Sequence, residues 1–380
     1  MRRRYDINMT RILFSLTAVL LLVACSNDSA TDEPAGEQRE LTLVPYVQQM
    51  QMVSDVAHRA LPAGFEPYVI GAGTTMVGFI APQRGNAVAA RIFTIGEDET
   101  QWKTNITIDD TSAPYYLYGF MPVGEETSTD IALSMPAGIT SYQEGARLTI
   151  RNMKALSMSD ACTIVGVKKG TGLTTGVNDP SVSILQGQFE YLFDTETKPE
   201  YVYLLFDHLM GALDVQMKVS DAYSTLRRIC IKSMHMAPMT AKTVDAVVDL
   251  TANSSGLSPL QGVPPVTFSV KTAGQGETIE LYKKPDGSTG KELTTVYQTM
   301  SVCYAACNVT RFKLTTQYDV YDRAGTLVRE DCMAENTFDL GLTLSDLKPG
   351  YVNHVRINVD PTYIHVLSDS DLDNPSFIIN

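Results

Sequence analysis

Residues 213–219 read Leu-Asp-Val-Gln-Met-Lys-Val, so apolar and polar side chains alternate strictly along this stretch. Successive side chains of a β-strand point to opposite faces, which places the apolar residues on one face and the polar ones on the other. The same alternation returns in residues 266–270 and 355–359. These stretches predict half-buried strands of antiparallel sheets.

Turn-forming residues break the strand patterns at short intervals. They occur at residues 285–287, at residues 349–350 and in the cluster of residues 254–265, while helical spacing of apolar residues is nearly absent. Many short strands with Gly and Pro between them are typical of β-sandwiches. The pattern therefore predicts an all-β protein.

Length and charge narrow the possibilities further. The chain of 380 residues is long enough for two domains of ordinary size. A polar stretch at residues 195–200 separates two series of strand-like segments, so we expect β-sandwich domains at residues 41–198 and 199–380. The formal net charge of −13 repels phosphate backbones, and nucleic-acid binding is not expected.

The first 25 residues have the order of a bacterial lipoprotein signal. Three arginines at residues 2–4 precede an apolar run at residues 12–24 that is too short to span a bilayer. We expect residues 1–24 to be removed, Cys25 to carry acyl chains such as palmitate, and residues 25–40 to form a flexible acidic tether. This predicts a lipid-anchored precursor on the cell surface, in the outer membrane. The alternative is an ordinary secretory signal with a chance cysteine.

The remaining cysteines do not form a disulfide or metal-binding pattern. They are Cys162, Cys230, Cys303, Cys307 and Cys332. Their odd number leaves at least one thiol unpaired in a monomer, and we expect all five to be small buried hydrophobes. A bridge from Cys303 or Cys307 to Cys332 is a minor alternative.

No catalytic motif stands out in the sequence. The histidines are scattered without metal-ligand spacing, at His58, His208, His235, His354 and His365. We expect no enzyme activity and no cofactor, and His208 is expected to have a structural role. A catalytic triad assembled only in space is the alternative left open.

An acidic stretch near the C-terminus is the one weak candidate for a metal site. Asp369, Asp371 and Asp373 alternate as calcium ligands do. The stretch lacks the glycine at the sixth position and the glutamate at the twelfth that a calcium loop uses. We interpret it as an acidic turn, with a calcium site as the weaker alternative.

Several stretches carry a resemblance to a known family. They are the cysteine-ended signal with its tether, Trp102 with residues 105–109 and 115–122, residues 206–215 with Tyr223 and residues 227–232, and residues 347–350 with 361–369. Together they resemble the fimbrillin family, lipoproteins that build type V pili in Bacteroidales. The matches cover most of the chain after the signal.

The resemblance implies two transthyretin-like (Greek-key) antiparallel β-sandwich domains in tandem and polymerisation by strand exchange. In this family a protease that cuts after arginine removes the first strand, and a strand of a neighbouring subunit takes its place. Residues 41–49 correspond to that strand, with Leu41, Leu43 and Val47 on one face. Arg59 and Ala60, after His58, resemble the processing site. Pro45 interrupts the strand, which is therefore expected to be bent or to lie at an edge.

The expected function is that of a structural or adhesive subunit of a surface fimbria. Its partners would be other fimbrial subunits and a ligand on a host or bacterial surface. One alternative is a non-polymerising fimbrial anchor or tip, because only residues 376–380 follow the acidic stretch as a donor strand. Another is a surface glycan-binding lipoprotein of a nutrient-uptake system, which would share the anchor, the acidity and the β-sandwich composition.

Overall fold

The computed structural model describes residues 37–52, 65–67, 74–82, 89–94, 102–108, 115–122, 130–142, 144–170, 190–191, 200–250, 266–343, 347–363 and 370–379. Strands make up most of these residues, and the helices among them are the single turns α2 (Asp221–Ser224) and α3 (Leu340–Thr343). The expected all-β class is therefore confirmed. None of the helices in this described part is long and apolar enough to cross a membrane.

The chain divides into two compact units. One holds residues 1–39 and 107–110, of which only the first residues of β1 and the last residues of β6 are described. The other holds residues 40–106 and 111–380 and contains nearly all of the described strands.

The largest sheet has nine strands. Its order is β3 (Phe65–Pro67), β1 (Glu37–Gln48), β13 (Glu200–His208), β11 (Cys162–Gly170), β7 (Tyr115–Met121), β4 (Thr75–Pro82) and β5 (Ala89–Thr94), with β12 (Glu190–Tyr191) paired to β7 and β6 (Trp102–Ile108) paired to β1. β6 and β7, which contain described residues of the family resemblance, contribute buried aromatic residues here. Trp102, Tyr116 and Tyr118 are almost completely buried, and the Trp102 ring lies 6.5 Å from that of Phe206.

Three smaller sheets contain the other strands. The six-stranded sheet has the order β10 (Leu156–Ser157), β20 (Gln298–Ala305), β14 (Gly211–Val219), β23 (Tyr351–Tyr363) and β2 (Gln51–Met52), with β24 (Ser370–Ile379) paired to β23. The five-stranded sheet has the order β18 (Ile279–Lys283), β15 (Arg227–Pro238), β21 (Arg311–Asp322) and β22 (Leu327–Asp339), with β19 (Lys291–Glu292) paired to β15. The four-stranded sheet has the order β17 (Val266–Ala273), β16 (Ala241–Asp249), β9 (Arg147–Lys154) and β8 (Ile131–Ser134).

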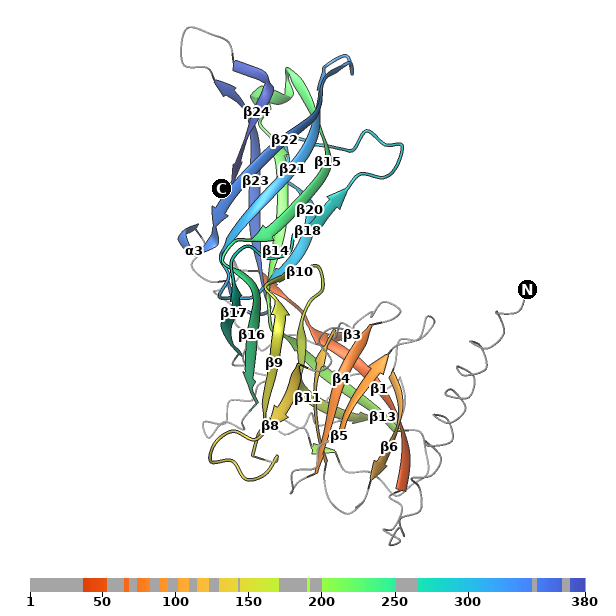
Figure 1. The fold of residues 1–380 in the computed structure, drawn as a ribbon. Helices are drawn as coiled ribbons and strands as arrows, with labels where there is room; N and C mark the ends of the chain where they lie inside the picture. Colours follow the sequence, from red (N-terminus) through yellow and green to blue (C-terminus); the bar gives the residue numbers. More distant parts are fainter. Residues whose placement is uncertain are drawn as a thin grey trace, which may run out of the picture. The chain divides into compact units, whose positions relative to one another are not determined.

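Two of the three alternating stretches behave as the sequence predicts. The apolar residues at positions 213, 215, 217 and 219 of β14 and at 355, 357 and 359 of β23 are buried, whereas the polar residues between them are mostly half-buried or exposed. In this sheet β14 lies between β20 and β23 (Figure 1). The third stretch differs, because β17 is an edge strand and the side chain of Val270 is 46% exposed. Alternation shows which residues share a face, but burial also requires a layer that covers this face.

Most of the described strand pairs are antiparallel, as expected, but three pairs are parallel. β1 with β13, β14 with β23, and β2 with β23 are parallel. Parallel partners need a long connection, and each of these pairs joins strands that lie far apart in the sequence.

The described sheets do not follow the expected division at residue 198. β13 begins at Glu200 and pairs with β1 and β11, which precede that position. β16 pairs with β9, and β20 pairs with β10. Three of the four sheets thus combine strands from both sides of the expected boundary, and the division into two domains stays a prediction.

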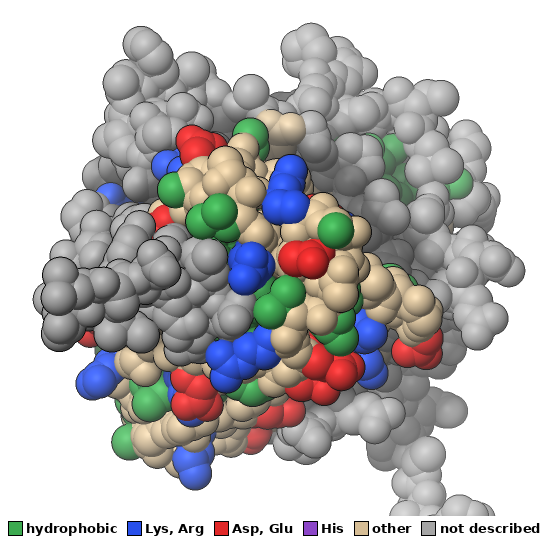
Figure 2. Space-filling model, turned by 90° about the horizontal axis from the view of Figure 1, so that it is seen from above, with side chains coloured by type: hydrophobic (Ala, Val, Ile, Leu, Met, Phe, Trp, Pro, Cys, Tyr) green, Lys and Arg blue, Asp and Glu red, His purple; other side chains and the backbone are tan. Residues whose placement is uncertain are grey.

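Charged side chains of both signs are interspersed on the described part of the face that Figure 2 shows. Apolar side chains are scattered among them and form no continuous field there. The negative net charge of the chain is therefore not gathered into one acidic patch on this part of the surface.

Candidate functional site

The first strand, β1, lies inside the nine-stranded sheet. Residues 41–47 run parallel to residues 200–206 of β13, and residues 46–48 pair antiparallel with β3. A parallel strand in the interior of a sheet is covered on both faces and therefore tends to be apolar throughout. The family resemblance predicts the first strand in residues 41–49, with one apolar face, and β1 ends at Gln48.

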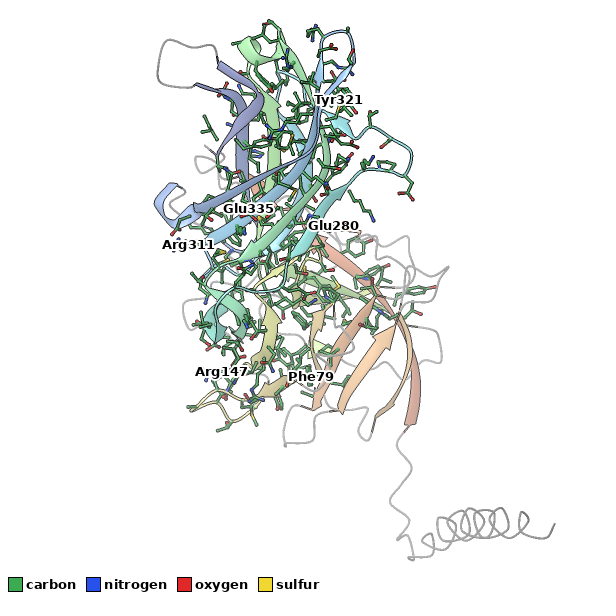
Figure 3. All side chains as sticks on the ribbon, turned by 45° about the horizontal axis from the view of Figure 1, so that its top comes forward. Phe79, Arg147, Glu280, Arg311, Tyr321 and Glu335 are labelled. Carbon is green, nitrogen blue, oxygen red and sulfur yellow. The ribbon has the colours of Figure 1, made fainter. Side chains whose placement is uncertain are left out.

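Both faces of β1 are buried. Leu43, with 1% of its surface exposed, lines a small apolar cavity on one face. The other lining residues are Met76, Gly78, Phe79, Ile80, Leu117, Tyr118, Ile164 and Leu204. Phe79 lies on β4, where Figure 3 labels it. The predicted burial of Leu43 and Val47 is confirmed, whereas the side chain of Leu41 lies outside the described residues.

The opposite face of β1 packs against a second apolar group. Val44 joins the buried residues Val165, Tyr203 and Leu205 in one cluster. The ring of Tyr46 lies 5.7 Å from that of Tyr203 in an edge-to-face arrangement. This arrangement stabilises an aromatic pair in addition to the contribution of the apolar area that it buries. The sequence pattern indicated only one apolar face for this strand.

Pro45 does not place β1 at an edge. It is buried and aligns with Leu204 of β13, just before the residues that pair with β3. A proline removes one backbone donor from the ladder. Burial of Leu43, Val44 and Val47 is worth more than one hydrogen bond, so the strand can keep its interior position.

The residues expected to be processed or lipidated lie outside the described residues. This is the case for Cys25, His58, Arg59 and Ala60. Arg39, the other arginine near the first strand, lies in β1. Their roles stay predictions.

The acidic stretch is extended where it is described. Asp369 lies outside the described residues, whereas Asp371 and Asp373 lie in β24 and Asp371 aligns with Thr362 of β23. Alternate residues of a strand are about 6.6 Å apart along one face, unlike the ligands of a calcium loop, which wrap around one point. The interpretation of residues 371 and 373 as part of a turn is therefore wrong.

A buried polar cluster was not indicated by any spacing in the sequence. It contains Asp160, Cys162 and His208, which are 7%, 0% and 4% exposed. The Nδ1 atom of His208 lies 2.6 Å from Oδ2 of Asp160 and 3.7 Å from Sγ of Cys162, and that Sγ lies 3.5 Å from the same Oδ2. Cys162 and His208 face each other in the register of β11 and β13.

The geometry of this cluster is not that of a catalytic triad. In a triad the base uses one ring nitrogen for the nucleophile and the other for the carboxylate. Here Cys162 and Asp160 both approach Nδ1 of His208. Burial, followed by the charge of Asp160, raises the pKa of the Cys162 thiol well above its usual value, so the thiol is protonated and weakly nucleophilic.

Neighbouring groups surround the cluster. Asp207 accepts a hydrogen bond of 2.8 Å from the backbone N–H of His208, and burial raises its pKa to about 6. Burial, followed by the nearby charge of Asp160, raises the pKa of the Tyr304 hydroxyl to about 12. The backbone N–H of Leu209 donates to the carbonyl of Ala161 at 2.7 Å, which joins the end of β13 to the start of β11.

The other described histidines have simpler surroundings. Nδ1 of His354 lies 2.9 Å from Oδ2 of Asp214, and Nε2 of His235 lies 3.7 Å from Oε2 of Glu280. His365 lies outside the described residues. Each described pair joins neighbouring strands of one sheet, as is common for polar residues on paired strands.

The five cysteines of the described part are free thiols, so the alternative of a bridge to Cys332 is wrong. The expected burial is confirmed for Cys162, Cys230, Cys303 and Cys332, whereas Cys307 is half-buried.

No family model and no curated protein matches the chain. Solved structures that are similar to it include a fimbrial protein from Bacteroides vulgatus, with 13% identity over 90% of this chain and 98% of that chain and a TM-score of 0.39. A protein from Bacteroides uniformis that is provisionally described as a cell adhesion protein has 10% identity to this chain, over 93% of this chain and 99% of that chain, and a TM-score of 0.39. The fimbrial anchor protein Mfa2 from Porphyromonas gingivalis has 9% identity over 89% and 95% of the two chains and a TM-score of 0.26.

Proposed function

We propose that this chain is a non-enzymatic structural and adhesive subunit of a surface fimbria. It is exported as a lipoprotein, and it assembles by strand exchange after a protease has removed the first strand. The observation that carries this proposal is the position of β1, which is buried on both faces and precedes the candidate cleavage site. In such a subunit the first strand occupies a place that a strand of another subunit can take.

Removal of β1 would leave an apolar groove. Full burial of an aliphatic side chain is worth about 1.5–3 kcal/mol, so Leu43, Val44 and Val47 together contribute several kcal/mol to the seated strand. Their loss would expose the lining of the cavity and unpair the edge of β13 along residues 200–206. An incoming extended segment restores both the apolar contacts and the backbone hydrogen bonds, so the groove selects a strand as its ligand.

The position of the cut matters for this mechanism. Cleavage after Arg59 would separate β1 and β2 from the rest of the chain, including the pairing of β2 with β23. Cleavage after Arg39 would leave residues 41–47, and with them the whole pairing to β13, in place. Only the first of these cuts opens the groove.

The test uses the chain without its signal, residues 26–380, treated with a protease that cuts after arginine. We expect a new amino terminus at Ala60, followed by polymers that light scattering and electron microscopy detect. Arg59→Ala should abolish both, whereas the matched control Arg39→Ala should polymerise as the unsubstituted chain does. Polymers that form at the same rate with Arg59→Ala would contradict the proposed processing.

A peptide tests the groove itself. A synthetic peptide of residues 37–52 should bind the cleaved chain and suppress polymerisation by occupying the place of β1. The control peptide carries Leu43→Asp and Val47→Asp, which places charges in an apolar site, and it should have no effect. A cleaved chain that stays monomeric and keeps its first strand would favour a fimbrial anchor. A monomer that binds a defined oligosaccharide would favour the glycan-binding alternative.

A further inference from the structure

The cluster of Asp160, Cys162 and His208 has no part in strand exchange. It brings together a carboxylate, a thiol and an imidazole whose donor atoms all lie within 4.8 Å of one another, in the interior of the protein. Buried polar groups normally complete their hydrogen bonds. Oδ1 of Asp160 is instead buried with no hydrogen-bond partner among the described residues. The cluster therefore has three convergent atoms that can bind a metal ion, and a carboxylate oxygen whose hydrogen-bonding capacity is unused.

We propose that Asp160, Cys162 and His208 form a structural site for a divalent transition-metal ion of the zinc type. Sulfur and nitrogen donors select zinc and its neighbours over calcium or magnesium, which prefer sets of oxygen ligands. Oδ1 of Asp160, in the same carboxylate as Oδ2, adds a longer second contact to the ion, which gives a distorted four-coordinate site. All three ligands are buried, which is typical of a closed structural site rather than of a catalytic one.

The separations of the donor atoms fit such an ion. With a Zn–S distance of about 2.3 Å and Zn–N and Zn–O distances of about 2.05 Å, the separations of 3.5 Å and 3.7 Å give S–Zn–O and S–Zn–N angles of about 107° and 116°. These angles are close to tetrahedral. The 2.6 Å between Nδ1 and Oδ2 is the length of a hydrogen bond, and it opens by about 0.7 Å when the ion replaces the shared proton.

Charge balance favours the ion in this buried place. Binding releases the thiol proton of Cys162, and His208 binds through Nδ1 as a neutral imidazole whose one ring proton is on Nε2. A divalent ion then faces one thiolate and one carboxylate, so the site has no net charge. A neutral site avoids the large cost of burying an unpaired carboxylate.

The ion would hold the ends of two strands together. Cys162 is the first residue of β11, and His208 is the last residue of β13, the strand that pairs with β1. Gly350, with φ of 73°, lies against the ring of His208, where an added Cβ would be 3.5 Å from Cδ2. This packing restricts the ring and keeps Nδ1 directed to the cluster.

The test uses residues 26–380, unfolded and refolded in the presence of ZnCl₂ or CoCl₂ and then passed through a desalting column. We expect one equivalent of metal per chain by mass spectrometry. The cobalt form should show a thiolate-to-cobalt charge-transfer band in the near ultraviolet together with tetrahedral d–d bands. Cys162→Ser and His208→Gln should each weaken binding at least tenfold. The matched control Cys303→Ser, which changes a buried cysteine outside the cluster, should bind as the unsubstituted chain does.

Each result decides the proposal. Less than about a tenth of an equivalent of zinc in the correctly refolded chain would overturn it, and so would a Cys162→Ser variant with an unchanged cobalt spectrum. If the variants do not fold, the spectrum of the unsubstituted chain decides, because a cobalt spectrum without the thiolate band excludes Cys162 as a ligand. None of these readouts depends on polymerisation, so the outcome is independent of the fimbrial proposal.

Discussion

Val44 of β1 is the Cα partner of Tyr203 of β13 in a parallel register, and both side chains are buried. The first strand is therefore part of the apolar core rather than a segment that lies on its surface. If this strand is removed, the core needs a replacement strand with apolar side chains on both faces.

Leu43→Ala should destabilise the uncleaved chain by about 2–5 kcal/mol, because it removes a buried side chain next to a small cavity. Chemical denaturation of residues 26–380 measures this free energy of unfolding. The control is Val270→Ala on the edge strand β17, where the side chain is 46% exposed and a change within about 0.5 kcal/mol is expected. Equal effects at the two positions would mean that β1 is not seated in the sheet.

Gly290→Ala should cost about 2–3 kcal/mol. Gly290 has φ of 104°, and an added Cβ would meet the backbone carbonyl of Ile231, which cannot easily move. Gly138→Ala is the matched control, because its φ is 85° but nothing lies within 4 Å of the added atom. The control should show only the backbone strain of about 1 kcal/mol. A smaller loss at position 290 than at position 138 would argue against this close approach.

Asp331→Asn should lower stability in a pH-dependent way. Nζ of Lys232 lies 2.6 Å from Oδ1 of Asp331, and this hydrogen bond lowers the pKa of the carboxyl and raises that of the amine. A carboxyl with a lowered pKa stabilises the fold above its ordinary pKa of 3.8, and this contribution is lost as the pH falls through the folded-state pKa. The raised pKa of Lys232 adds stability below 10.5, which is lost as the pH rises through its folded-state value.

The measurement is the urea midpoint of Asp331→Asn against that of the unsubstituted chain from pH 2 to pH 8. The difference should be constant above about pH 5 and should vanish at the acid end. Glu335→Gln, which changes the exposed pair with Lys313 at 2.8 Å, serves as the control and should have a smaller effect. A difference that grows as the pH falls would have the wrong sign for this cluster.

Cys25→Ala should release the protein from the membrane fraction and abolish labelling with a palmitate analogue. The reason is that the thiol of Cys25 is the expected attachment point of the acyl chains, which together anchor the protein stably. Cys307→Ala, a change at another cysteine, should leave fractionation unchanged. Persistence of the Cys25→Ala protein in the membrane fraction would contradict the lipoprotein assignment.

The strands that could be predicted are those whose pattern is local. Alternation along residues 213–219 and 355–359 correctly indicated the buried faces of β14 and β23. The same pattern at residues 266–270 failed to predict burial, because β17 lies at the edge of its sheet and Val270 is exposed. Whether another layer covers a strand depends on residues far away in the sequence.

The sites were harder to predict than the strands. The sequence indicated that Leu43 and Val47 are buried, but it did not indicate that Val44 is buried on the opposite face, since this depends on the parallel pairing with β13. The Asp160 and Cys162 pair is too short a pattern to indicate a site. His208 joins this pair only through the register of β11 with β13.

The sequence by itself determined the all-β class and the apolar face of several strands, because alternation with a period of two is a local property of the chain. Tertiary structure alone decided which strands are neighbours, which of them run parallel and where β1 lies. It also brought Asp160, Cys162 and His208 within reach of one point. Such convergence depends on the pairing of segments that lie some 46 residues apart, and no local pattern encodes that pairing.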